Sequence, residues 1–206
     1  DTKKIHEHEI PDGERAHYSK RTIDFEFEYP FGQKELYGLA YRTDYDLKQH
    51  EKFSGQDLSY HDQETGEKFI PHVIEPTWGV DRTFLAVLLS AYQEDDKRVF
   101  LKLNPRLAPY TVAVFPLVRN KPEITENARR VYNSLKRSLC TIWDVRGNIG
   151  KRYYAQDEIG TPWCVTVDYD TLKDDAVTVR DRDTTEQIRI KIADLNEHFN
   201  KLLNGI

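Results

Sequence analysis

Three things are scarce or absent in this chain of 206 residues: methionine, cysteine and long apolar runs. With no methionine, even at position 1, we expect the chain to be a piece of a longer protein. Cys140 and Cys164 lie in apolar, strand-like runs without a CxxC pair, which favours buried free thiols over a disulfide or a metal site. No apolar run approaches the roughly 20 residues that cross a bilayer, and no signal peptide is recognisable. These absences predict a cytoplasmic protein without a membrane partner.

Positive charge is also in short supply. The formal net charge is −5, which argues against indiscriminate binding to nucleic acids and against DNA as a partner. Residues 1–107 carry 15 Lys and Arg against 21 Asp and Glu, a balance of −6, whereas residues 108–206 carry 15 against 14, a balance of +1. The second half is therefore the better candidate for contact with RNA.

The first half is typical of antiparallel strands that end in a helix. From Thr22 to Tyr29 apolar and acidic residues alternate strictly, which predicts a half-buried strand. The pattern further predicts a strand over 35–43, a short helix over 44–52, a hairpin over 58–74, and a buried helix to about residue 93 with Val80, Phe84, Val87, Leu88 and Ala91 as its apolar stripe. Residues 1–17 are polar, and we expect a frayed or partner-dependent start there with His6, His8 and His17 as surface residues.

The second half alternates strands with helices. Residues 111–117 are almost continuously apolar, as in a strand covered on both faces. The remaining pattern predicts helices over 123–139, 148–158 and 193–203, strands over 140–145 and 163–169, and a hairpin of 176–182 with 187–192. This order predicts an α/β layer with a mixed sheet. Residues 98–109, with two prolines, are the expected join between a first domain of residues 1–107 and a second of residues 108–206.

One segment combines groups suited to a nucleotide and an amine. Residues 75–82 read Glu-Pro-Thr-Trp-Gly-Val-Asp-Arg and lead into an apolar helix. Gly79 allows close approach of a ligand to the backbone, and the helix start favours an anion. Arg82 offers a planar cation for a phosphate or an adenine ring, and Glu75 offers a charge for an ammonium group. The alternative is an ordinary strand-to-helix turn with solvated charges at Asp81 and Arg82.

Three stretches together resemble a known family. Residues 75–82, the upstream Glu-Leu-Tyr-Gly-Leu-Ala-Tyr-Arg-Thr-Asp-Tyr-Asp-Leu-Lys-Gln-His of residues 35–50, and the downstream Asp-Glu-Ile-Gly-Thr-Pro of residues 157–162 closely resemble the homodimeric glycyl-tRNA synthetases of class II. Residues 75–82 look like the third signature motif of that class. The likeness covers the C-terminal part of the family's protein, and nothing here resembles the first two motifs. It implies part of an antiparallel class II catalytic sheet, followed by a mixed-sheet anticodon-binding domain.

The resemblance also implies the roles of individual residues in the first half. Arg82 and Glu35 would be catalytic, with Glu35 holding Mg²⁺ against the phosphates of ATP. The implied ATP-binding residues are Glu35, Leu36, Gly79, Val80, Asp81 and Arg82. The implied glycine-binding residues are Glu75, Pro76, Thr77, Trp78 and Gly79. Trp78 has the bulk to exclude any side chain larger than that of glycine, and the alternative is that it packs in the core.

In the second half, cations stand beside rings or acids, as in proteins that bind single-stranded RNA loops. Lys151, Arg152 and Arg182 are the candidates for tRNA contact, and solvated surface pairs are the alternative. Asp157 and Glu158 either accept from a cytosine amino group or brace the end of a helix.

The sequence therefore predicts the C-terminal part of a glycine–tRNA ligase, with ATP, Mg²⁺, glycine and tRNA(Gly) as cofactors and partners and a homodimeric parent. Without the first two motifs, this part alone should be inactive. A catalytically inactive, synthetase-like accessory or RNA-binding protein is the alternative. A binding module unrelated to synthetases would leave residues 75–82 unexplained.

Overall fold

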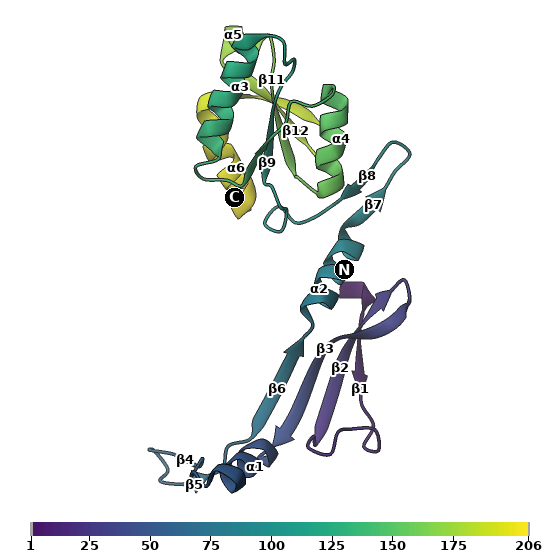
Figure 1. Ribbon diagram of the computed structural model, residues 1–206, viewed down its shortest axis with the longest axis vertical. Helices are drawn as coiled ribbons and strands as arrows, with labels where there is room; N and C mark the ends of the chain where they lie inside the picture. Colours follow the sequence, from purple (N-terminus) through teal and green to yellow (C-terminus); the bar gives the residue numbers. More distant parts are fainter. Residues whose placement is uncertain (1, 206) are drawn as a thin grey trace. The chain divides into compact units, whose positions relative to one another are not determined.

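The computed structural model describes residues 2–205, and the chain divides into two compact units that meet between Ser90 and Ala91 (Figure 1). The structural division thus comes before the boundary at residue 107 that the prolines suggested. The first unit is an antiparallel sheet and the second a mixed sheet with helices, so the predicted fold class is confirmed.

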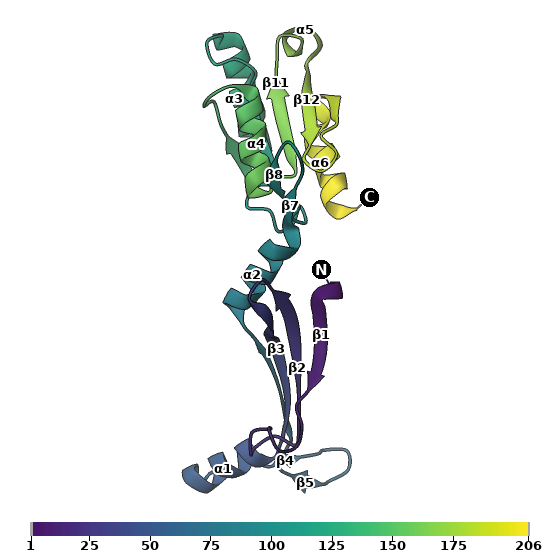
Figure 2. The same cartoon turned by 90° about the vertical axis from the view of Figure 1, so that its right-hand side faces the viewer.

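The first unit is built on a four-stranded sheet in the order β1-β2-β3-β6, in which all neighbours are antiparallel (Figure 1). Figure 2 shows β1, β2 and β3 side by side. Its elements are η1 (Thr2–Lys4), β1 (Ile5–Glu9), β2 (Arg21–Tyr29), β3 (Gly32–Thr43), α1 (Tyr45–Ser54), β4 (Tyr60–His61), β5 (Lys68–Phe69), β6 (Val73–Trp78) and α2 (Val80–Ala91). The predicted strands, the short helix and the hairpin are all present, but β4 and β5 are only two residues each.

The start of the chain is more ordered than its composition suggested. Strand β1 pairs with β2 from Ile5 opposite Phe27 to Glu9 opposite Ile23. His6 Nε2 lies 2.6 Å from Glu28 Oε1, and Arg21 Nε donates to Glu9 Oε1 at 2.9 Å. The prediction of a frayed start is therefore wrong for these residues, because the neighbouring strand supplies both backbone partners and opposite charges.

A β-bulge in β3 separates its apolar residues from its polar ones. Glu26 lies opposite Glu35 and Phe25 lies opposite Tyr37, so Leu36 is the extra residue. Leu36 is buried with Phe27, Tyr29 and Ala86 in the small core of this unit. Glu35, in contrast, stays on the opposite, polar face of the sheet.

Helix α2 is less buried than predicted. Only Ala86 and Ala91 are buried, whereas Val80 is 80% and Phe84 65% exposed. Its apolar stripe therefore lacks a cover within the described part of the first unit.

The second unit contains the five-stranded sheet β10-β9-β11-β12-β13. Strand β9 is parallel to both β10 and β11, while β12 and β13 are antiparallel, so the sheet is mixed. The elements are β7 (Tyr92–Glu94), β8 (Val99–Leu101), β9 (Val112–Pro116), α3 (Pro122–Leu135), β10 (Thr141–Trp143), α4 (Ile149–Ile159), β11 (Trp163–Val167), α5 (Thr171–Asp174), β12 (Ala176–Asp181), β13 (Gln187–Lys191), η2 (Ile192–Asp194) and α6 (Leu195–Asn204).

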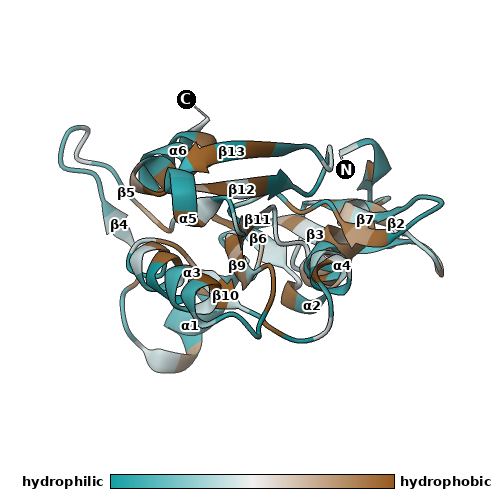
Figure 3. Ribbon diagram, turned by 90° about the horizontal axis from the view of Figure 1, so that it is seen from above, coloured by the Kyte–Doolittle hydropathy of each residue, from teal (hydrophilic) through white to brown (hydrophobic). Residues whose placement is uncertain are grey.

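Helices cover both faces of this sheet (Figure 1). Val112 and Val114 of β9 face a core that includes Ile124 of α3 and Phe199 of α6. The alternate residues of β9, such as Phe115, face Ile149 and Tyr153 of α4. In Figure 3 the apolar residues of β9, β12 and β13 are brown, and much of α3 is teal. The near-continuous apolar character of β9 follows from burial on both faces.

Hairpin β7–β8 belongs to the second unit. Phe100 and Leu103 are buried, and β8 packs on α4. Gly160, at the end of α4, has φ +83°, and a Cβ there would lie 2.8 Å from Leu103 Cδ1. The segment predicted to be a join is therefore part of the folded unit.

Two expectations about burial can be compared directly with the structure. Cys164 is buried, and burial raises the pKa of its thiol, but Cys140 is exposed, so the prediction of two buried thiols is wrong for Cys140. Within residues 2–205, no helix is long and apolar enough to cross a membrane.

Candidate functional site

The first candidate site lies on the polar face of the first sheet. Residues that pair across antiparallel strands share a face, and Asp24 lies opposite Gly38, which lies opposite Thr77. Glu75 lies opposite Ala40 on the same face. The bulge at Leu36 adds Glu35 to this group. Three acids and a hydroxyl therefore surround a floor made of glycine and alanine.

Gly38 leaves space beside the carboxylates of this face because it has no side chain. A Cβ at Gly38 would lie 3.3 Å from Glu35 Oε1, closer than most real Cβ contacts, and 3.8 Å from Asp24 Oδ1, which is ordinary contact. At Gly79, a Cβ would lie 3.5 to 3.8 Å from the Cβ, Cγ and Cδ atoms of Arg82, which is ordinary contact. The sequence drew attention to Gly79, but the glycine that opens space beside the carboxylates is Gly38.

Glu75 is held by an arginine that the sequence analysis did not single out. Arg42 Nη1 donates to Glu75 Oε2 at 2.7 Å, and the same guanidinium grips Asp46 through Nε at 2.6 Å and Nη2 at 2.7 Å. The hydrogen bond with Asp46 is the largest cause of the raised pKa of Arg42. The Arg42 guanidinium also lies 3.9 Å from the centre of the Tyr18 ring. Glu75 is thus fixed in place while its side chain stays 45% exposed.

Arg82 and Glu35 meet at the start of α2. Arg82 Nη1 donates to the backbone oxygen of Glu35, and it lies 3.7 Å from Glu35 Oε2. Both side chains are about half exposed, at 53% and 48%. Arg82 is therefore oriented by a backbone acceptor, and the two side chains do not form a tight ion pair with each other.

Other predicted residues of this site have different surroundings. Leu36 is 4% exposed, so its side chain belongs to the core and does not face a ligand. Trp78 is 63% exposed, and its ring lies at 69° to that of Tyr37, with 6.4 Å between the ring centres. This exposure excludes core packing within the described part of this unit. The remaining predicted residues lie at the surface, apart from the half-buried Gly79: Pro76, Thr77, Val80 and Asp81.

The acids of this face can be compared with the arrangement of side chains that a metal ion needs. Within residues 2–205, no group of three His, Cys, Asp or Glu side chains is arranged to hold a metal ion. Burial raises the pKa of the Asp24 carboxyl; the charge of His8 opposes that rise, and Glu26 adds to it. A Mg²⁺ ion here would depend on Glu35 together with oxygens from a bound phosphate.

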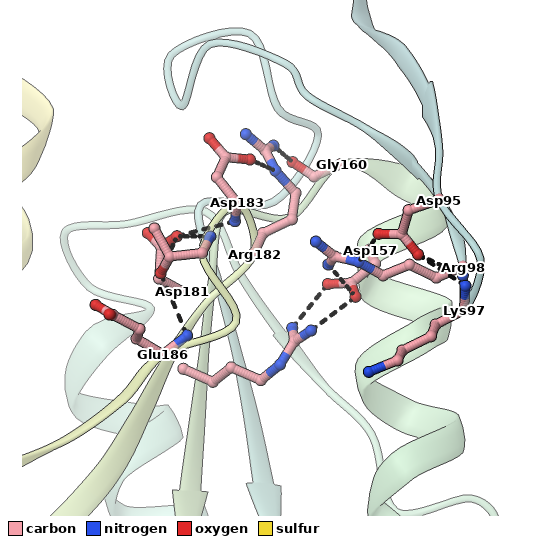
Figure 4. A network of polar contacts seen from close by, with 11 residues as sticks. Asp95, Lys97, Arg98, Asp157, Gly160, Asp181, Arg182, Asp183 and Glu186 are labelled. Atoms are coloured by element: carbon pink, nitrogen blue, oxygen red, sulfur yellow. Dashed lines mark hydrogen bonds and ion pairs between the residues drawn. The ribbon is translucent and has the colours of Figure 1, made fainter.

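The second candidate site centres on a buried carboxylate in the second unit (Figure 4). Asp157 of α4 is fully buried and receives two hydrogen bonds from Arg180, at 2.8 and 2.9 Å, and one from Arg98, at 2.7 Å. Burial lowers the pKa of Arg180, but the bonds to Asp157 outweigh burial, and the net shift is upward. Arg98 also contacts Asp95 within its own hairpin. The network therefore ties hairpin β7–β8 to α4 and β12.

Arg182 makes a second tie in the same region. It is 2% exposed, and its guanidinium donates to the backbone oxygens of Gly160 at 2.7 Å and Leu103 at 2.9 Å. Its Nε donates to Asp183 at 2.7 Å. This side chain is engaged inside the protein and is not presented to a partner.

The structure separates the five predicted tRNA contacts into two groups. Arg152 is 3% exposed, donates to the backbone oxygen of Pro116 at 2.6 Å, and has its pKa lowered by burial. Arg152, Asp157 and Arg182 thus all point into the interior, which does not agree with their assignment to RNA contact; Asp157 instead braces a helix. Lys151 and Glu158 are exposed.

Comparison with known proteins identifies a domain family within the second unit. Residues 111–202 match the family described as "Anticodon binding domain". A glycine–tRNA ligase of Corynebacterium efficiens is 49% identical over the whole chain. The chain belongs to the glycine–tRNA ligase family.

Further relatives in this family have similar identity. The glycine–tRNA ligase of Lachnospira eligens is 52% identical over 90% of the chain, and that of Thermobifida fusca is 49% identical over all of it. The chain covers 46% of the Corynebacterium and Thermobifida proteins and 41% of the Lachnospira protein. It therefore spans less than half the length of the curated relatives it matches.

Proposed function

We propose that this chain is the part of an ATP-dependent glycine–tRNA ligase that supplies the third class II motif and the anticodon-binding domain. The observation that carries the proposal is the polar face on which Glu35, Glu75 and Arg82 flank a floor of Gly38. An anion-binding arginine and an ammonium-binding carboxylate on one narrow face are what joining an amino acid to ATP requires. The parent enzyme acts as a homodimer on glycine and tRNA(Gly).

The chemistry assigned to this face is positioning and electrostatic stabilisation. When a carboxylate oxygen of glycine attacks the α-phosphorus of ATP and pyrophosphate leaves, negative charge develops on the phosphate oxygens, and a preorganised guanidinium lowers the energy of that state. Arg82 is oriented by the backbone oxygen of Glu35, so it needs little rearrangement to meet those oxygens. Glu35 would hold a Mg²⁺ ion, which neutralises phosphate charge when bound.

Glycine selectivity is assigned to Glu75 and its surroundings. Arg42 fixes the Glu75 carboxylate at 2.7 Å, and the exposed part of that carboxylate binds the ammonium group of glycine. Thr77 adds a hydroxyl, and the exposed ring of Trp78 supplies bulk against larger side chains.

The decisive experiment is glycine-dependent ATP–pyrophosphate exchange. In the full-length parent, Arg82→Ala should lower kcat/KM by about 100-fold or more, about 3 kcal/mol, as for the loss of a preorganised donor. Arg21→Ala is the matched control, because that arginine binds Glu9 on the surface and should leave exchange unchanged. The isolated chain should show no exchange.

The same assay separates the alternative function. A parent protein without glycine-dependent exchange would be an inactive, synthetase-like accessory protein. Normal exchange by Arg82→Ala would instead reduce residues 75–82 to an ordinary turn with solvated charges.

A further inference from the structure

The exposed side of helix α3 concentrates positive charge in an acidic chain. Residues 119–137 contain six Arg and Lys against two Glu, a balance of +4 in a chain whose net charge is −5. All six cations are exposed and together form the basic face of α3: Arg119, Lys121, Arg129, Arg130, Lys136 and Arg137. Within residues 2–205 none of them forms an ion pair. The described chain therefore leaves this charge without a counter-charge.

Four of these cations form two rows along the helix. One row is Arg129 and Lys136, and the other is Arg130 and Arg137. Residues seven apart lie on one side of a helix, about 10 Å from each other. Helical hydrogen bonding continues past the last residue of α3, because the backbone N–H of Lys136 donates to the oxygen of Tyr132 at 3.0 Å. The rows thus present positive charges at regular spacing.

Uncharged partners hold both rows in place. The Arg129 guanidinium lies 3.9 Å from the centre of the Trp143 ring, and the Lys136 ammonium nitrogen lies 5.0 Å from the centre of the Tyr132 ring. In the other row, Arg130 Nη2 donates to the Asn127 side-chain oxygen. Rings and amides orient a cation without neutralising it.

Helix stability explains only part of this charge. The negative end of the helix dipole favours cations near the C-terminus, which accounts for Lys136 and Arg137. Arg129 and Arg130 lie in the interior of α3, where the dipole has little effect. Lys121 immediately precedes the first residue of α3, where the positive end disfavours a cation. The remaining cations indicate an anionic partner.

The neighbouring side chains favour a phosphate backbone over a protein surface. Asn133 and Ser134 are exposed beside the cations, and amide and hydroxyl groups, like Arg and Lys, are typical contacts of phosphate and sugar. Within residues 2–205, α3 has no exposed large apolar side chain. The centres of protein–protein interfaces are instead enriched in aromatic residues.

The rings of this region favour a paired RNA over a single strand. Proteins that bind single strands stack unpaired bases on open aromatic rings. The rings of Tyr132 and Trp143 are half-buried, and Lys136 and Arg129 lie over them. They are therefore not open to a base.

We propose that the basic face of α3 binds the sugar–phosphate backbone of a double-helical RNA stem, without choosing its sequence. Phosphate contacts fix the position and orientation of a nucleic acid and carry no sequence information. The face lies on the opposite side of the sheet from α4, and none of the tRNA contacts predicted from the sequence belongs to it. The proposal rests on the proposed function only for the source of the stem, which is a tRNA.

The test measures binding of the 206-residue chain to three RNAs: tRNA(Gly), the same tRNA with a substituted anticodon, and a plain RNA hairpin. One variant combines Arg129→Gln, Arg130→Gln, Lys136→Gln and Arg137→Gln. It should bind all three RNAs about 100-fold more weakly at about 0.1 M salt, and the slope of log K against log salt should become shallower by about 3. Fluorescence anisotropy measures each Kd, and circular dichroism confirms that the variants are folded.

Two controls separate local charge from net charge and from packing. The first combines Lys48→Gln, Lys68→Gln, Lys173→Gln and Lys201→Gln, four exposed lysines that pair with carboxylates elsewhere. It changes the net charge equally and should weaken binding less than about 5-fold. The second combines Arg129→Lys, Arg130→Lys and Arg137→Lys, which keeps the charge of the face and should keep the salt slope.

Three outcomes would overturn the proposal. The first is an unchanged salt slope in the Gln variant of the basic face, or no RNA binding by the unaltered chain. The second is a loss of affinity confined to tRNA(Gly), because backbone contact does not read sequence. The third is competition by polyglutamate as effective as by RNA of equal charge, because the face would then bind any polyanion. The proposed ligase activity is measured by pyrophosphate exchange, which needs no RNA, so its failure would be distinct.

Discussion

Replacing Asp157 with asparagine should strongly destabilise the second unit. The carboxylate is fully buried and receives three hydrogen bonds from two arginines that are themselves 6% and 7% exposed. Asparagine keeps one acceptor oxygen but turns an NH₂ group toward guanidinium donors. It leaves Arg180 without its carboxylate partner and leaves Arg98 with only Asp95, at 3.3 Å. Removing one partner of a buried ion pair costs about 3–5 kcal/mol, and two charge-assisted bonds of about 1.5–3 kcal/mol each give a similar figure.

We therefore expect the free energy of unfolding to fall by about 4 kcal/mol, and Tm of this unit by about 15 °C for a unit of this size. Urea denaturation followed by circular dichroism and tryptophan fluorescence measures the change, since Trp143 and Trp163 both lie in the second unit. Asp170→Asn is the matched control, because Asp170 pairs with Lys173 on the surface, where both are more than 70% exposed, and should change little.

An equal effect of Asp157→Asn and Asp170→Asn would refute this reasoning. A triple variant, Asp157→Leu with Arg98→Met and Arg180→Met, separates charge from packing. Well-packed apolar groups often replace a buried ion network without loss, so this variant should recover much of the stability. If it is less stable than Asp157→Asn, the loss arises from packing and not from unpaired charge.

Two further changes test the backbone and the acid response of the second unit. Gly160→Ala should lower the free energy of unfolding by about 2 kcal/mol in urea denaturation, because φ is +83° and a Cβ would meet Leu103. Gly205→Ala is the control, because φ is +70° there but the space is open, and it should cost clearly less. Equal losses would show that the clash with Leu103 does not contribute. Asp168 has a lowered pKa: burial raises it, but hydrogen bonds from Thr171 and Arg189 outweigh burial. The contribution of Asp168 to stability is thus fully present above its unfolded-state pKa of about 4 and is lost as pH falls through its lower folded-state pKa. In the Asp168→Asn variant, the free energy of unfolding should therefore fall less steeply below about pH 4. An unchanged dependence of stability on pH would contradict this.

The spacing of apolar residues was sufficient to predict the main strands and helices. The alternation in β2, the apolar run of β9 and the spacing in α3 each depend on neighbours within a few residues, so they can be predicted from the chain alone. Ile124, Ala128, Val131 and Leu135 are the buried residues of α3, which ends at Leu135 and not at residue 139 as predicted.

The errors concern partners that are distant in the sequence. Strand β1 is polar and becomes ordered only because β2 lies beside it. Asp157 is buried because arginines 59 and 23 residues away meet its carboxylate, and no local pattern marks such a meeting. The sequence identified Glu35, Glu75 and Arg82 as candidates, but Gly38 and Arg42 gained a role only from the pairing of β3 with β6.

The attachment of hairpin β7–β8 to α4 bears on how such a module can be inherited. The recognised domain family begins at residue 111, yet Arg98 and the backbone oxygen of Leu103 complete the surroundings of Asp157 and Arg182. A recombination event that joined this domain to a different protein at residue 111 would leave those buried charges partly unpaired. The unit that evolution can transplant intact therefore begins with the hairpin, at about residue 91.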